Sequence, residues 1–210
     1  MKPMIKLLAA FALLLATFGQ PSTASAGDVS TFKWGSVTAY FPFTSIDPSG
    51  CLITSATVGG VEERLHTPPG KASTSGLVYV QVSLFNLCTD TRVLNAFGSA
   101  PLPTSDLKIT GNLSSVTLTT TVNVFDQISG TFFDVFIDLT WRGTGEIIRD
   151  RTHDVFNFEG CHFNIRDDLA SRSAQASGTI SDGTINFTPE PSISATIFAW
   201  QGGEVSHGCD

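Results

Sequence analysis

The chain has 210 residues, and its 12 Lys and Arg against 19 Asp and Glu give a formal net charge of −7 at pH 7. An acidic surface repels phosphate backbones, so the composition disfavours nucleic acid as a partner. No long stretch has the 3.6-residue period of a helix. The pattern predicts an all-β fold, a single-domain antiparallel β-sandwich or alternatively a closed β-barrel, of about ten strands.

The first 26 residues have the pattern of a signal peptide. Lys2 and Lys6 precede an apolar run over 7–18, and Ala24-Ser25-Ala26 is a small-residue cleavage site. Cleavage there removes two of the 12 basic residues and leaves the β domain, 27–210, with a net charge of −9. No second apolar run is long enough to cross a bilayer. We therefore expect a secreted or periplasmic protein with no membrane span.

Four cysteines predict two disulfides, because thiols in an exported chain pair by default. The strand-like segments 51–65 and 76–88 flank a Pro-Pro-Gly loop, which brings Cys51 beside Cys88. Cys161 and Cys209 then pair by elimination. No Cys-x-x-Cys spacing occurs, so we expect no metal site on thiolates.

In the first half of the chain we expect strands at 29–41, 51–65, 76–88, 92–99 and 107–110. Gly35 predicts a β-bulge between Trp34 and Val37. From the alternation of apolar residues we expect the side chains of Trp34 and Trp141 in the core. Asp47-Pro48-Ser49-Gly50 has the residues of a tight turn.

The clearest element is a hairpin formed by 116–124 and 131–142. In both segments apolar residues occupy alternate positions, which is typical of a strand with one buried face. If the loop closes between Asp126 and Thr131, both apolar sets share one face. This register predicts three cross-strand pairs: Val124 with Phe133, Val122 with Val135, and Leu118 with Leu139.

After a turn at 142–145 we expect a return strand at 146–158, a short strand at 161–165 and a helical turn at 167–170. The pair Asp182-Gly183 predicts a two-residue hairpin between 174–181 and 184–188. In that register Ile180 faces Ile185, and Phe187 lies across from Gly178. The last strand is expected at 192–201.

Segment 146–158 carries charges at both alternations, which indicates either an edge strand protected against aggregation or part of a site. We favour the edge strand. The alternative is a ligand-binding site, for which oxygen-rich side chains of this kind suit Ca²⁺ as a possible cofactor. The candidate residues on strands expected to be neighbours are Asp134, Asp138, Arg142, Asp150, His153 and Asp154.

His153 and His162 flank a run of aromatic residues and could approach each other across a turn at 159–160. With Asp154 nearby they are the candidate catalytic residues of a hydrolase or lyase. His66 and His207 lie in a loop and in the tail, where we expect them to be solvated. The chain has no assembled catalytic, nucleotide-binding or metal motif, so no cofactor other than the Ca²⁺ alternative is expected.

Two surface features remain. Phe125, Phe132 and Phe136 lie on the second face of the central hairpin, and we expect a loop or sheet edge to cover them. Asn112 and Asn186 begin N-glycosylation sequons, whose use depends on the host.

Together the pattern predicts a secreted, non-catalytic β-sandwich protein that binds a ligand, a surface polymer or a protein partner outside the cytoplasm. The alternative is a secreted hydrolase or lyase that uses His153 and His162. A structural component of a surface assembly is the third hypothesis.

Overall fold

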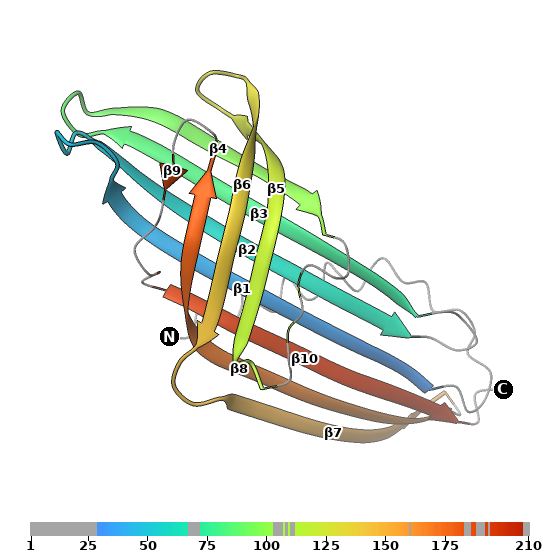
Figure 1. The fold of residues 1–210 in the computed structure, drawn as a ribbon. Helices are drawn as coiled ribbons and strands as arrows, with labels where there is room; N and C mark the ends of the chain where they lie inside the picture. Colours follow the sequence, from blue (N-terminus) through green and yellow to red (C-terminus); the bar gives the residue numbers. More distant parts are fainter. Residues whose placement is uncertain are drawn as a thin grey trace.

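A computed structural model describes residues 29–66, 72–102, 107, 109, 112–159, 161–182, 186–187, 192 and 194–207; the predicted signal peptide lies outside them. The fold is all-β, as predicted, with ten strands in one antiparallel sheet (Figure 1). The described part of the chain contains no helix with the length and apolarity needed to cross a bilayer. The strands are β1 (Val29–Ser45), β2 (Leu52–His66), β3 (Ser73–Asn86), β4 (Thr91–Pro101), β5 (Ser115–Asp126), β6 (Phe132–Gly143), β7 (Ile148–Phe158), β8 (Cys161–Ser181), β9 (Asn186–Phe187) and β10 (Ser194–His207).

The order of paired strands is β10-β1-β2-β3-β4-β5-β6-β8-β7, and β9 pairs with the end of β8. Strand β8 also pairs with β10, so it links the two ends of the path from β10 to β6. Figure 1 shows β5 and β6 lying across β1, β2 and β3. The sheet therefore folds back over itself, and the two layers enclose an apolar core.

The core is built from alternate positions of the crossing layers. On β6 the inward side chains are Val135, Ile137, Leu139 and Trp141, none of which is more than 1% exposed. The indole Nε1 of Trp141 donates a hydrogen bond of 2.9 Å to the backbone oxygen of Thr38 on β1, which ties the layers together. The facing layer contributes mainly aliphatic residues, including Val37, Ala39, Val58, Val80 and Ile197.

The central hairpin is confirmed in both register and loop. The backbone N–H of Asp126 donates to the oxygen of Thr131 at 2.9 Å, which closes the loop as expected. The observed cross-strand pairs are the predicted ones: Val124 with Phe133, Val122 with Val135, and Leu118 with Leu139.

The Cys51–Cys88 disulfide is also confirmed, with 5.3 Å between the two Cα atoms. It joins the start of β2 to the residues that follow β3, next to the turn at 47–50, where the N–H of Gly50 donates to the oxygen of Asp47. Cys161 is disulfide-bonded, and Cys209, its predicted partner, lies outside the described residues.

The prediction of a bulge at Gly35 is wrong. Gly35 pairs in register with Glu62 on one side and Ala199 on the other, and the register shift of β1 lies between Phe41 and Thr44. The reason for glycine is close approach, because a Cβ there would lie 2.7 Å from Cδ1 of Ile109.

Two further expectations for this region also change. Of the predicted strand at 107–110 only Leu107 and Ile109 are described, and neither is in a strand. Trp34 alternates with the buried Gly35 and Val37, so it lies on the outer face and not in the core. On the outer face its ring packs edge-on against Phe198.

The second half of the chain departs further from expectation. Strand β7 does not return along β6 but pairs with β8, and it is the last strand of the sheet. The predicted helical turn at 167–170 is part of β8, a single strand of 21 residues. Asp167 and Asp168 pair with β7 on one side and β10 on the other, so their backbone groups have strand partners in both directions.

The β8–β9 hairpin exists with a register shifted by two residues. Ile180 pairs with Phe187, whereas Ile185 lies outside the described residues. Gly178 pairs with Leu139 of β6. A two-residue slip keeps every side chain on the same face, so the alternation of apolar residues could not distinguish the two registers.

Two of the three aromatic side chains on the outer face of the hairpin, Phe132 and Phe136, stay exposed among the described residues, contrary to expectation, whereas Phe125 is half-buried. Phe132 is 68% exposed and Phe136 is 43% exposed. Phe125 packs between Phe132 and Phe97, with ring centroids 5.0 Å and 6.4 Å away.

Candidate ligand-binding site

At one end of the sheet the inner face changes from apolar to charged. On β1 the buried positions Val37 and Gly35 are followed toward the N-terminus by Lys33. On β2, likewise, the buried Val58 is followed at alternate positions by Glu62 and Arg64. Because alternate residues of a strand share a face, these charged side chains point to the same side as the core. We call this region the polar inner face.

The polar inner face consists of rows of residues paired across five strands, β2, β1, β10, β8 and β7. Neighbouring strands lie about 4.8 Å apart, so a row spans about 19 Å. The first row, next to the core, is Glu62, Gly35, Ala199, Ala170 and Arg149. The second row is Arg64, Lys33, Gln201, Asp168 and Arg151. The third row is His66, Thr31, Gly203, Arg166 and His153.

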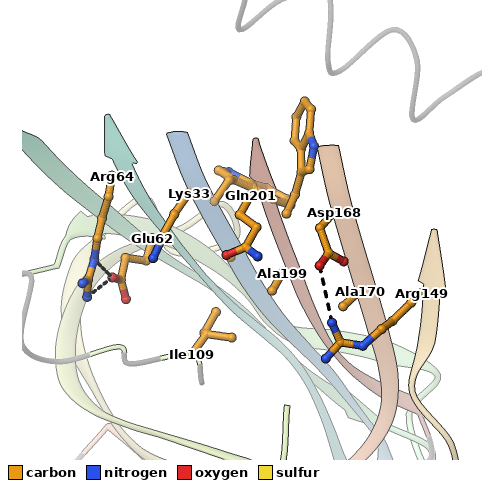
Figure 2. Close-up of a pocket in the computed structure, with 12 residues that line it drawn as sticks. Lys33, Glu62, Arg64, Ile109, Arg149, Asp168, Ala170, Ala199 and Gln201 are labelled. Atoms are coloured by element: carbon orange, nitrogen blue, oxygen red, sulfur yellow. Dashed lines mark hydrogen bonds and ion pairs between the residues drawn. The ribbon is translucent and has the colours of Figure 1, made fainter. Parts of the chain in front are cut away.

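Small residues in the first row leave a hollow between longer charged side chains. A cavity of about 680 Å³ lies over Gly35, Ala199 and Ala170, with Ile109 at its core side (Figure 2). A second cavity of about 600 Å³ shares Lys33, Asp168 and Gln201 with the first. A third, of about 410 Å³, shares Arg166 and Gly203 with the second. The hollow therefore continues along β10 and β8 away from the core.

Two carboxylates organise the charged side chains around the first cavity. Oδ2 of Asp168 lies 3.3 Å from Nε of Arg151 and 3.6 Å from Nη1 of Arg149. Oε1 of Glu62 accepts hydrogen bonds from the guanidinium of Arg64, as the dashed lines in Figure 2 mark.

Each of these carboxylates has a second oxygen that is buried and has no partner in the part of the chain that the structure describes. Oε2 of Glu62 and Oδ1 of Asp168 have no hydrogen-bond partner among the described residues. Glu62 is only 8% exposed, so this is a buried acceptor at the wall of an open cavity. An unpaired buried polar atom carries a desolvation cost that a hydrogen-bond donor would remove.

The polar inner face carries more positive than negative charge, in contrast to the chain as a whole. Five cations of the inward alternation line the three cavities, against two acids, Glu62 and Asp168, whereas the full sequence has 12 basic and 19 acidic residues. Asp167 also borders the second cavity, but its carboxylate lies beside Phe32 and Gly202 on the other face. The cations are Lys33, Arg64, Arg149, Arg151 and Arg166. This arrangement can hold an anion that the rest of the surface would repel.

The ligand-binding candidates on β6 lie elsewhere. Asp134 and Asp138 are exposed on the outer face of β6, where they accept hydrogen bonds from Nδ2 of Asn123 at 2.7 Å and Oγ1 of Thr119 at 2.9 Å. Arg142 occupies the same alternation and is also exposed. None of the three lines the cavities of the polar inner face.

The remaining candidates lie on β7, and the structure does not bring them beside those on β6. Asp150 and Asp154 alternate with the inward-facing Arg149 and Arg151, so they lie on the outer face. Asp150 lies opposite Leu169 of β8, whereas Asp138 of β6 lies opposite Thr179 of β8. These two positions of β8 are ten residues apart, or about 33 Å along the strand. The described residues contain no group of three or more His, Cys, Asp or Glu side chains that could hold a metal ion.

The two histidines share a face but are not neighbours. His153 pairs with Arg166, and His162 pairs with Asn157, four residues further along β7, or about 13 Å. Nε2 of His153 lies 3.0 Å from Oδ1 of Asn164, and Nδ1 of His162 lies 2.9 Å from Oδ1 of Asn157. Among the described residues each imidazole thus has its own asparagine partner and not a shared carboxylate.

Sequence reasoning missed most residues of the polar inner face. A signal was present, because in three strands the inward alternation turns from small or apolar to charged: at Lys33 before Gly35, at Glu62 after Gly60, and at Asp168 before Ala170. Recognising it requires knowing that these three strand ends lie side by side, which depends on the pairing of β1 with β10 and of β10 with β8.

The chain matches no protein-family model, no curated protein and no solved structure.

Proposed function

We propose that this protein acts outside the cytoplasm as a non-catalytic binding protein whose polar inner face holds a polar, anionic ligand. The observation that carries the proposal is the concentration of five cations around connected cavities in a chain that is acidic overall. Export is supported by the leader-like segment 1–26 and by the Cys51–Cys88 disulfide.

The length of the site favours an extended ligand over a single small ion. The cavities adjoin one another along β10 and β8, and the cations lie in three successive rows. Rows are two residues apart, or about 7 Å, so an oligomer with repeated acidic groups can contact several of them at once.

Binding is favoured over the hydrolase or lyase alternative by the placement of the catalytic candidates. His153 lies about 13 Å along β7 from Asn157, the residue opposite His162 of β8, and Asp154 alternates onto the other face. A general acid and base must reach the same reacting group within hydrogen-bond distance.

Isothermal titration with tetragalacturonate and with neutral maltotetraose tests the proposal. We expect the acidic oligomer to bind and the neutral one to bind at least about tenfold more weakly. The double variant Lys33→Gln/Arg166→Gln should lose about tenfold or more in affinity, since each removes a charge from the face.

Arg142→Gln is the matched control, because it removes an exposed cation from the outer face of β6. Equal binding of both oligomers, or an equal loss in the Arg142→Gln control, would contradict the proposal. Cleavage of either oligomer that stops in His153→Ala would favour the hydrolase or lyase instead.

A further inference from the structure

The first cavity contains two kinds of polar group with opposite requirements. Lys33, Arg64 and Arg149 supply positive charge, whereas Glu62 and Asp168 each present one carboxylate oxygen without a partner among the described residues. A simple anion such as sulfate or phosphate would satisfy the cations but would be repelled by these oxygens. The cavity therefore requires hydrogen-bond donors as well as negative charge.

The donors that suit this cavity are neutral. Three cations and two carboxylates line it, so its net charge is positive and a cationic ligand group is disfavoured. A hydroxyl group can donate to a carboxylate without adding charge. Glu62 is held in place through Oε1 by Arg64, which leaves Oε2 as a buried acceptor beside the cavity. A ligand hydroxyl reaches this oxygen, or the buried Oδ1 of Asp168, by displacing a neighbouring side chain of the cavity wall.

We infer that Oε2 of Glu62 and Oδ1 of Asp168 accept hydrogen bonds from ligand hydroxyl groups, and that the preferred ligand is an acidic sugar. This inference rests on the proposed function and specifies its ligand class. The two carboxylates lie on β2 and β8, with β1 and β10 between them, so they act on opposite sides of the cavity, as Figure 2 shows. Lys33 and Gln201 of the second row lie between them.

The inference predicts that removing a carboxylate from the site weakens the binding of an acidic sugar, whereas charge alone predicts stronger binding. Removing a negative charge from the site strengthens the binding of any anion if charge alone matters. In the variants Glu62→Gln and Asp168→Asn, however, one carboxylate oxygen is replaced by an NH2 group, which cannot accept a hydrogen bond. The remaining amide oxygen should face the arginine partner, so the NH2 group takes the place of the unpartnered oxygen. We expect tetragalacturonate, which carries hydroxyl and carboxylate groups, to bind about tenfold more weakly to each variant. Tripolyphosphate, which has charge but no sugar hydroxyls, should bind as tightly as before or more tightly.

Matched controls are available one residue or one strand away. Glu63→Gln removes a carboxylate next to Glu62 on the exposed outer face of β2. Asp150→Asn removes an exposed carboxylate of β7 opposite Leu169, the neighbour of Asp168. Neither control should weaken tetragalacturonate. Thermal unfolding of each variant checks that the fold is retained, and Asp168→Asn decides the question if Glu62→Gln does not fold.

The outcomes separate this inference from the proposed function. If the unmodified protein binds neither anion, the proposed function itself fails. If it binds both anions and the Glu62 and Asp168 variants bind tetragalacturonate as well as or better than before, only the hydroxyl-acceptor assignment is overturned. Parallel weakening of both probes overturns it too, because that result indicates a loss of structure or of cations rather than of a hydroxyl contact.

Discussion

Asp126 is the residue on which the loop of the central hairpin depends. It is only 3% exposed, and its carboxylate accepts backbone N–H groups from Asn95 and Ile128 on Oδ1 and from Ser129 on Oδ2, at 3.0 to 3.1 Å. Burial raises the pKa of the Asp126 carboxyl, but the hydrogen bonds from Ser129 and from the backbone outweigh it and lower the pKa to about 2. The carboxylate thus joins the loop to β4 in its ionised form.

The depressed pKa predicts a specific loss of stability in acid. A group with a folded pKa of about 2 and an ordinary value of 3.8 stabilises the fold above pH 3.8, and this contribution declines as the pH falls toward 2. Asp126→Asn should reduce the free energy of unfolding by about 2 kcal/mol at pH 7, and the difference from the unmodified protein should shrink toward pH 2. Urea denaturation at pH 7 and pH 2.5 measures both values.

The exposed Asp134, eight residues along the chain, provides the control for this comparison. Asp134→Asn should change stability by no more than about 0.5 kcal/mol, because its carboxylate makes one surface hydrogen bond. A difference between the Asp126 variant and the unmodified protein that stays constant from pH 7 to pH 2.5 would show that ionisation is not its source.

At the scale of elements, β8 is the strand that determines how the sheet closes. Residues 162–174 pair with β10, and residues 174–181 pair with β6. Gly178 lies in the second part with a φ of +143°, and a Cβ there would lie 2.0 Å from the backbone oxygen of Asp138. Both the dihedral angle and the contact exclude a side chain at this point.

We expect Gly178→Ala to destabilise the protein by at least about 2 kcal/mol, because β8 and β6 would have to separate or the backbone would have to change its conformation. Gly145→Ala is the matched control, since Gly145 also has a positive φ, +70°, but no atom within 4 Å of a Cβ. It should cost about 1 kcal/mol. Chemical denaturation compares the two, and equal losses would show that the contact with Asp138 has no effect.

The same element explains how far the fold could be predicted. The β5–β6 hairpin was predictable because each strand has one apolar face and the loop is short, so a one-residue slip would expose one apolar set. In β8 neither face is consistently apolar, and the paired acids Asp167 and Asp168 resemble a helix start more than a strand. Its strand conformation is imposed by β7 and β10 on either side, which is information that a local pattern does not contain.

Strand β7 was predicted correctly as an edge strand, but the ligand-binding site predicted on it was wrong. All 11 of its residues are exposed and it ends the sheet, as its charges on both faces indicated. The candidate site was predicted from the assumption that β7 lies beside β6, and that assumption fails. Arg149 and Arg151 therefore face Asp168 of β8, and not the acids of β6.

At the scale of the whole molecule, local and overall charge have opposite signs. The net charge of the chain is −7, yet the polar inner face is lined mainly by cations. Contacts within the site set the dissociation rate of an anionic ligand, whereas charges far from it act on the rate of association through the long-range field. The acidic exterior should therefore slow the approach of the ligand that the site binds.

This separation can be measured with Asp134→Asn/Asp138→Asn, which removes two exposed negative charges on β6 remote from the polar inner face. At about 10 mM salt, where the screening length is about 30 Å, the association rate of tetragalacturonate should rise roughly twofold. At about 150 mM salt, where that length is about 8 Å, the gain should vanish.

Arg166→Gln should instead raise the dissociation rate at both salt concentrations, because Arg166 lines the second and third cavities. Stopped-flow fluorescence separates the two rates, and an unchanged association rate at low salt would show that the exterior charge does not act on the ligand.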